Sequence, residues 1–126
     1  MSPNVISLAS RVHIVLLCGD ECIAKPLADR LNRSGARVTL IGNPDLLFCD
    51  LEDVVESDAL WVIVSGDDAL RLGQFCRLLE VDNVISPHTW KLFWVGGDAP
   101  VGLSALTGVF PELPRVDQMI EASRGG

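Results

Sequence analysis

The sequence predicts one α/β domain in which a mostly parallel sheet of about five strands carries helices on both faces. Short apolar runs end repeatedly at glycine, and helix-like segments follow them. The clearest run is residues 60–64, where β-branched and aromatic side chains predominate, as is typical of a strand buried on both faces. Because strands that alternate with helices form βαβ units, the sheet is expected to be parallel.

The expected elements follow one another in a regular order. The first strand covers residues 12–18, and the helix after it covers residues 21–34, with a buried stripe that includes Ile23. A later helix, at residues 69–80, is expected to turn Leu70 inward. The other strands are expected at residues 37–41, 60–64, 91–95 and 107–110, and the other helices at residues 50–57 and 115–123.

The two most apolar strands, residues 12–18 and 60–64, are expected at the centre of the sheet. With right-handed crossovers, this favours the flavodoxin-like strand order 2-1-3-4-5, doubly wound with helices on both faces. A length of 126 residues, of which 48% are hydrophobic, suits a single domain over residues 1–126.

Charge and composition exclude several classes of partner and location. A net charge of −7 disfavours nucleic acid, because an acidic surface repels the phosphate backbone. No apolar stretch approaches the roughly 20 residues that span a membrane, and no signal peptide is apparent, so the cytoplasm is expected. The four cysteines should then be reduced, and no second Cys or His pair suggests a metal site.

A candidate ligand site lies after the two central strands, because ligands bind an open α/β sheet at the carboxyl ends of such strands. The residues of the two loops are Gly19, Asp20, Glu21, Ser65, Gly66, Asp67 and Asp68. Carboxylates that converge in this way raise one another's pKa or recruit a cation. The simpler interpretation is that the acids cap and stabilise the N-termini of the following helices.

Two kinds of phosphate chemistry fit this edge poorly. A phosphoreceiver pocket also uses acids after the first and third strands, but it needs a lysine after the fifth, where Phe110 is followed by Pro111. A thiol site at Cys18 would hold an anion, which Asp20 and Glu21 oppose. Cys18 is therefore expected to be a buried core thiol.

Several segments resemble those of a Toll/interleukin receptor (TIR) domain or of a bacterial TIR-like relative. Residues 13–41 are similar to the family's first strand, helix and second strand. Residues 50–65 are similar to a helix and a strand that each end in serine, and Phe75 and Cys76 to an aromatic-cysteine pair in the third helix. The similarity extends over most of the chain.

The resemblance implies a signalling module that acts by protein–protein assembly, without efficient catalysis and without a cofactor. Many TIR domains hydrolyse NAD with a glutamate three residues after the cysteine, a position that is Leu79 here. The alternative is an NAD hydrolase whose catalytic residue is Glu80, one residue further on and about 100° around the helix.

An apolar cluster, Leu46, Leu47 and Phe48, follows a turn where polar residues are expected. In the family that the chain resembles, this loop makes contacts between domains. If the cluster is exposed, it predicts self-association or a protein partner. Folding back over the sheet edge is the structural alternative.

Overall fold

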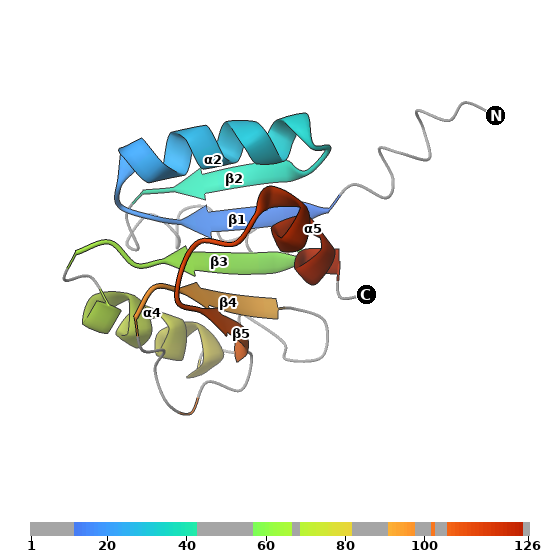
Figure 1. Ribbon diagram of the computed structural model, residues 1–126. Coiled ribbons are helices and arrows are strands. Elements are labelled where there is room, and N and C mark those ends of the chain that lie inside the picture. The colour runs from blue at the N-terminus through green and yellow to red at the C-terminus, as the bar shows by residue number, and fades with distance from the viewer. Residues whose placement is uncertain are drawn as a thin grey trace.

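The computed structural model describes residues 12–42, 57–66, 69–81, 91–97, 102 and 106–124. It contains a five-stranded parallel sheet with the order β2-β1-β3-β4-β5 (Figure 1), which confirms the predicted flavodoxin-like fold. The strands are β1 (His13–Leu17), β2 (Arg37–Ile41), β3 (Ala59–Ile63), β4 (Lys91–Val95) and β5 (Leu106–Phe110). The described helices are α2 (Glu21–Arg33), α4 (Ala69–Val81) and α5 (Val116–Arg124).

The centre of the sheet is formed by β1 and β3, as their apolar sequences predict. The two strands pair in parallel, with Ile14 opposite Ala59 and Leu17 opposite Val62. Every residue of both strands is buried. Two fully buried neighbouring strands require cover on both faces, which explains why their apolar residues run without alternation.

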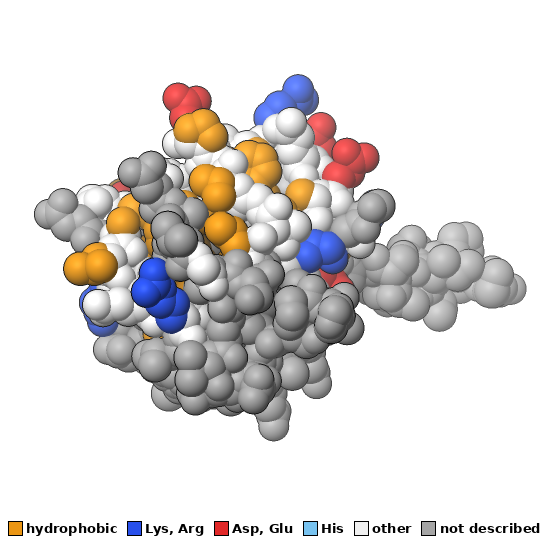
Figure 2. Space-filling model, turned by 90° about the horizontal axis from the view of Figure 1, so that it is seen from below, with side chains coloured by type: hydrophobic (Ala, Val, Ile, Leu, Met, Phe, Trp, Pro, Cys, Tyr) orange, Lys and Arg blue, Asp and Glu red, His pale blue; other side chains and the backbone are white. Residues whose placement is uncertain are grey.

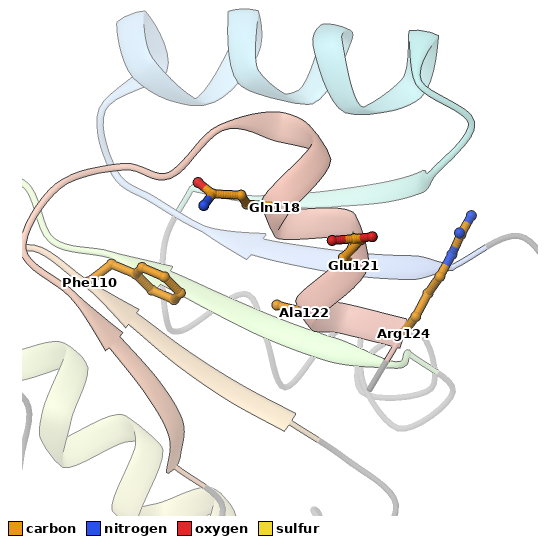
Figure 3. Close-up of a pocket in the computed structure, with 5 residues that line it drawn as sticks. All are labelled: Phe110, Gln118, Glu121, Ala122 and Arg124. Carbon is orange, nitrogen blue, oxygen red and sulfur yellow. The ribbon is translucent and has the colours of Figure 1, made fainter. Parts of the chain in front are cut away.

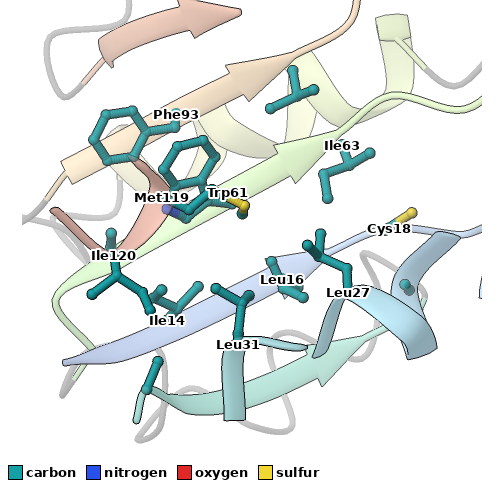
Figure 4. Close-up of a cluster of buried hydrophobic side chains, with 14 of the residues drawn as sticks. Ile14, Leu16, Cys18, Leu27, Leu31, Trp61, Ile63, Phe93, Met119 and Ile120 are labelled. Atoms are coloured by element: carbon teal, nitrogen blue, oxygen red, sulfur yellow. The ribbon is translucent and has the colours of Figure 1, made fainter. Parts of the chain in front are cut away.

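Each face of the sheet has its own hydrophobic core. On one face, α4 packs on side chains that include Leu17, Val62 and Trp94. On the other, α2 and α5 pack on side chains that include Leu16 and Trp61 (Figure 4). The chain is therefore doubly wound, with described helices on both sides of the sheet.

An aromatic stack crosses β3, β4 and β5 on the face that carries α5. The Trp61 and Phe93 ring centroids are 4.2 Å apart, and those of Trp61 and Phe110 are 5.5 Å apart. Trp61 Nε1 donates a hydrogen bond of 2.8 Å to Ser123 Oγ, which itself donates to the Met119 carbonyl at 2.7 Å. These contacts fix α5 on the sheet and satisfy the buried indole N–H.

The predicted inward positions are wrong at one residue in each of two helices. Ile23 is 37% exposed, and the buried residues of α2 are Ala24, Leu27 and Leu31. Leu70 is 75% exposed, and the buried residues of α4 include Leu72, Phe75 and Cys76. Each residue turns about 100° around a helix, so Leu70 lies nearly opposite Leu72. Apolar residues on several sides of each helix made the buried stripe ambiguous.

Candidate functional site

The ends of the parallel strands place several loops side by side at one edge of the sheet. Cys18 N donates to Ile41 O at 3.1 Å, and Val64 N donates to Val95 O at 2.9 Å. Gly96 N donates to Phe110 O at 2.8 Å. These backbone bonds continue the ladder past the strand ends. They hold the segments after β1, β3 and β4 in fixed positions at the predicted site.

Asp20 has a structural role at this edge. It is the N-cap of α2, where its Oδ1 accepts a hydrogen bond of 2.9 Å from Cys22 N. Its carbonyl accepts another, also of 2.9 Å, from Ala24 N. The capping interpretation is confirmed for Asp20, because its carboxylate satisfies a helix N–H that would otherwise lack a partner.

Glu21 occupies the first turn of α2 and points into solvent. Its Oε2 lies 3.6 Å from Lys25 Nζ, one helical turn further on, and both side chains are more than two-thirds exposed. An exposed pair of this kind contributes little to stability. In this structure, the negative charge of Glu21 therefore interacts favourably with the dipole at the N-terminus of α2.

Replacing Asp20 with alanine is expected to lower the free energy of unfolding by about 0.5–2 kcal/mol, because α2 loses its cap. Urea unfolding followed by circular dichroism measures the change. Asp20→Asn keeps an acceptor and should cost less. Equal losses in the two variants would show that the charge matters and the cap does not.

The third strand ends in neutral groups. Ser65, two residues after the end of β3, is partly buried, and Gly66 adopts a φ of 63°, a left-handed conformation that favours glycine. Asp67 and Asp68 lie outside the described residues. Within the described part of the chain, no group of three or more His, Cys, Asp or Glu side chains could hold a metal ion. The four-carboxylate crevice therefore stays a prediction.

The end of β5 carries an aromatic side chain in place of a cation. Phe110 is partly buried, and its ring belongs to the stack on Trp61. The sequence contains only two lysines. Lys25 pairs with Glu21 on α2. Lys91 is the first residue of β4, so it lies at the N-terminal ends of the strands, opposite the predicted site. Its Nζ donates a hydrogen bond of 3.2 Å to Ser123 O.

Cys18 and His13, the other reactive side chains of β1 and its end, are part of the core. Cys18 is 1% exposed, and its Sγ lies 3.6 Å from Asp20 O. His13 is buried, and its Nε2 lies 2.8 Å from Thr39 Oγ1. This confirms the expected buried thiol at Cys18.

A groove of about 600 Å³ runs between β5 and α5. Figure 3 shows the Phe110 ring on the β5 side and the other lining side chains on α5. The lining residues are Phe110, Gln118, Glu121, Ala122 and Arg124. Sequence reasoning missed this groove, because its two sides are brought together only by the docking of the last helix. The one available signal was an aromatic residue at the end of a weakly apolar strand.

No family model and no curated protein matches this chain. Solved structures do. A CheY-like response regulator receiver domain from Methanospirillum hungatei superposes with a TM-score of 0.69 and 9% identity, over 90% of this chain and 91% of that one. A two-component response regulator from Clostridium difficile has a TM-score of 0.67 and 12% sequence identity, over 91% of this chain and 94% of that one. The pseudo-receiver domain of the CikA protein has a TM-score of 0.65 and 17% sequence identity, over 89% of this chain and 92% of that one.

These neighbours overturn the TIR interpretation. These three structures are receiver, response regulator and pseudo-receiver proteins and not TIR domains, so the resemblance to TIR domains is wrong, and so are the TIR-like signalling module and the NAD hydrolase. The error has a physical cause, since alternation of strands and helices around a doubly wound sheet does not distinguish one such family from another. Glu80 lies on α4, and its side chain is outside the described residues.

Among the described residues, none of the helices has the length and apolar character that crossing a membrane requires.

Proposed function

We propose that this chain is a receiver-like module that binds another protein and does not undergo phosphoryl transfer. The observation that carries the proposal is Phe110 at the end of β5, where a phosphoreceiver pocket needs a lysine. Lys25 and Lys91, the two lysines of the sequence, are engaged elsewhere. The fold of a receiver domain is therefore present without the cation of its phosphate pocket.

Electrostatics supports the same conclusion. A phosphoryl group on a side chain carries a charge of about −1.5 to −2 at neutral pH. The loops at this edge contribute Asp20 and Glu21 after β1, and the chain as a whole has a net charge of −7. A bound divalent cation would have to offset all of this repulsion alone. The aromatic ring of Phe110 supplies no compensating charge.

Protein binding is supported by the surface on the β5 side of the molecule. The groove beside α5 joins an aromatic ring with an amide, a carboxylate and a guanidinium group. Leu113, in the segment between β5 and α5, is 39% exposed, and Val109 is 48% exposed on the other face of β5. Apolar area rimmed by polar groups is characteristic of interaction sites. The likeness to a pseudo-receiver domain agrees with this function.

A phosphorylation assay tests the proposal. The protein is incubated with acetyl phosphate and Mg²⁺, and its intact mass is measured beside a phosphorylatable receiver domain treated in the same way. We expect no gain of a phosphoryl group under conditions that modify the control domain. Stoichiometric modification that disappears in the double variant Asp67→Asn, Asp68→Asn would overturn the proposal.

Two sites predicted from the sequence are kept as proposals. The loops containing Asp20 and Asp67 could hold a divalent cation, which calorimetry with Mg²⁺ on wild type and Asp67→Asn would detect. The apolar cluster at residues 46–48 lies outside the described residues and stays a predicted protein contact.

A further inference from the structure

Basic side chains gather at the end of the molecule where the strands begin, opposite the candidate site. Arg30 and Arg33 lie in the last turn of α2, and Arg124 lies in the last turn of α5. Arg37 and Lys91 are the first residues of β2 and β4. These five residues, half of the ten basic residues of the sequence, are called the basic end.

The connections of the fold bring the basic end together from separate parts of the chain. The strands are parallel, so β2 and β4 begin at the same edge of the sheet. Only residues 34–36 join α2 to β2, so α2 ends at this edge. Lys91 Nζ donates a hydrogen bond of 3.2 Å to Ser123 O, so α5 also ends there. The two helices contact each other on one face of the sheet, and Figure 3 shows Arg124 at the end of α5 away from Phe110.

The four arginines of the basic end have guanidinium groups available to a ligand. All four are exposed, and within the described part of the chain none of them makes a hydrogen bond or an ion pair through its side chain. Positive charge at a helix C-terminus is favourable in itself, which accounts for Arg30, Arg33 and Arg124 one by one. Arg37 begins a strand, so this reason does not apply to it.

The opposite end of the same two helices is acidic. Glu21 and Asp117 lie in the first turns of α2 and α5, and Asp20 is the N-cap of α2. The neighbouring bases are engaged, since Lys25 Nζ lies 3.6 Å from Glu21 Oε2 and Arg115 Nε lies 3.5 Å from Asp117 Oδ1. The chain as a whole has a net charge of −7. A negatively charged partner is therefore repelled by most of the molecule and attracted at the basic end, which fixes where it docks.

We propose that the basic end binds an acidic segment of a partner protein, whose carboxylate side chains pair with the exposed arginines. A guanidinium group binds a carboxylate through two parallel hydrogen bonds, whereas a lysine ammonium group acts as a point charge. Clusters of arginine recognise acidic motifs in this way. Arg124 also lines the groove beside β5, so the basic end is continuous with the surface proposed above for protein binding. This inference rests on the proposed function, because it names the chemistry of the protein partner.

The apolar side chains of the surface lie elsewhere, which favours a protein segment over a membrane. The exposed large hydrophobic residues of the described chain are Ile23, Leu40, Leu70, Val109 and Leu113. They lie in the first turns of α2 and α4, in the second halves of β2 and β5, and after β5. Figure 2 shows apolar side chains grouped on the face of the molecule seen from below, with charged side chains around them. Membrane surfaces are bound by apolar side chains next to basic ones, and the described residues of the basic end supply the charge alone.

Fluorescence anisotropy with a labelled peptide in which Glu and Ser alternate tests the inference. The wild type is compared with the double variant Arg33→Ser, Arg37→Ser and with the charge-matched double variant Lys25→Ser, Arg115→Ser. We expect the wild type to bind the peptide, with an affinity that falls as salt is added. The first double variant should bind at least about tenfold more weakly. The second removes the same charge from the acidic end and should change the affinity by less than about twofold.

All four substituted side chains are exposed, so both double variants should keep the circular dichroism of the wild type. A wild type that does not bind the peptide, or equal weakening by both double variants, would overturn the inference. Sedimentation with vesicles of phosphatidylcholine and phosphatidylserine, in the absence of peptide binding, would overturn it in favour of a membrane. Self-association that Arg33→Ser, Arg37→Ser abolishes would overturn it in favour of a second copy. The phosphorylation assay involves none of these arginines, so failure here and failure of the proposed function are distinguishable.

Discussion

Replacing Trp61 with alanine is expected to lower the free energy of unfolding by about 3–5 kcal/mol. Trp61 is fully buried at the centre of β3, and its ring contacts Phe93 and Phe110 in the aromatic stack. Its loss would leave a cavity between the sheet and α5, and Ser123 Oγ would lose its indole donor. Urea unfolding monitored by far-ultraviolet circular dichroism measures the effect.

Trp61→Phe separates packing from hydrogen bonding. It keeps an aromatic ring in the stack and removes the indole N–H, while Ser123 Oγ still donates to the Met119 carbonyl. We therefore expect a smaller loss of stability than for Trp61→Ala. Equal losses in the two variants would show that the hydrogen bond, and not the buried ring, holds α5 in place.

Replacing Leu31 with alanine is expected to lower the free energy of unfolding by about 2–5 kcal/mol. Leu31 is fully buried in the core that α2 shares with β1, β3 and α5. Ile23 is the matched control, because it lies on the same helix and is 37% exposed. Ile23→Ala should cost less than about 1 kcal/mol, as for most surface substitutions. A larger loss for Ile23→Ala than for Leu31→Ala would contradict the observed burial of α2.

The fold could be predicted from the sequence because its strongest signals are local. The apolar runs that became β1 and β3 are fully buried, and each described strand lies within two residues of its predicted bounds. The order of the strands followed from placing the two most apolar runs at the centre of the sheet. Burial on both faces leaves a continuous apolar sequence that a half-exposed strand does not have.

The likeness to receiver domains and the buried faces of the helices could not be predicted as well. A sequence of alternating strands and helices is shared by TIR-like and receiver-like interpretations, so segment order could not choose between them. The face of α4 was misjudged at Leu70, because leucines occur on more than one side of that helix. The groove between β5 and α5 depends on long-range docking, for which the sequence carries no periodic signal.

The candidate site was predicted in part. The sequence placed Asp20 at the end of a strand and offered helix capping as an alternative to ligand binding, and the structure shows the cap. The absence of a lysine after the fifth strand was also visible in the sequence, as Phe110 and Pro111. From the sequence alone, the missing lysine argues against a phosphoreceiver pocket, yet the receiver-like fold and the missing cation occur in the same molecule.

Binding of beryllofluoride tests most directly the proposed function, in which this receiver-like fold has no working phosphate pocket. This anion mimics a phosphoryl group on a carboxylate, so its binding with Mg²⁺ reports a working pocket even when covalent transfer is slow. Two-dimensional ¹H–¹⁵N spectra of the labelled protein would be recorded with Mg²⁺, before and after beryllofluoride is added. We expect the amide signals of Gly19, Gly66 and Gly96 to stay in place. Saturable shifts of these signals, lost in Asp67→Asn or Asp68→Asn, would contradict the claim.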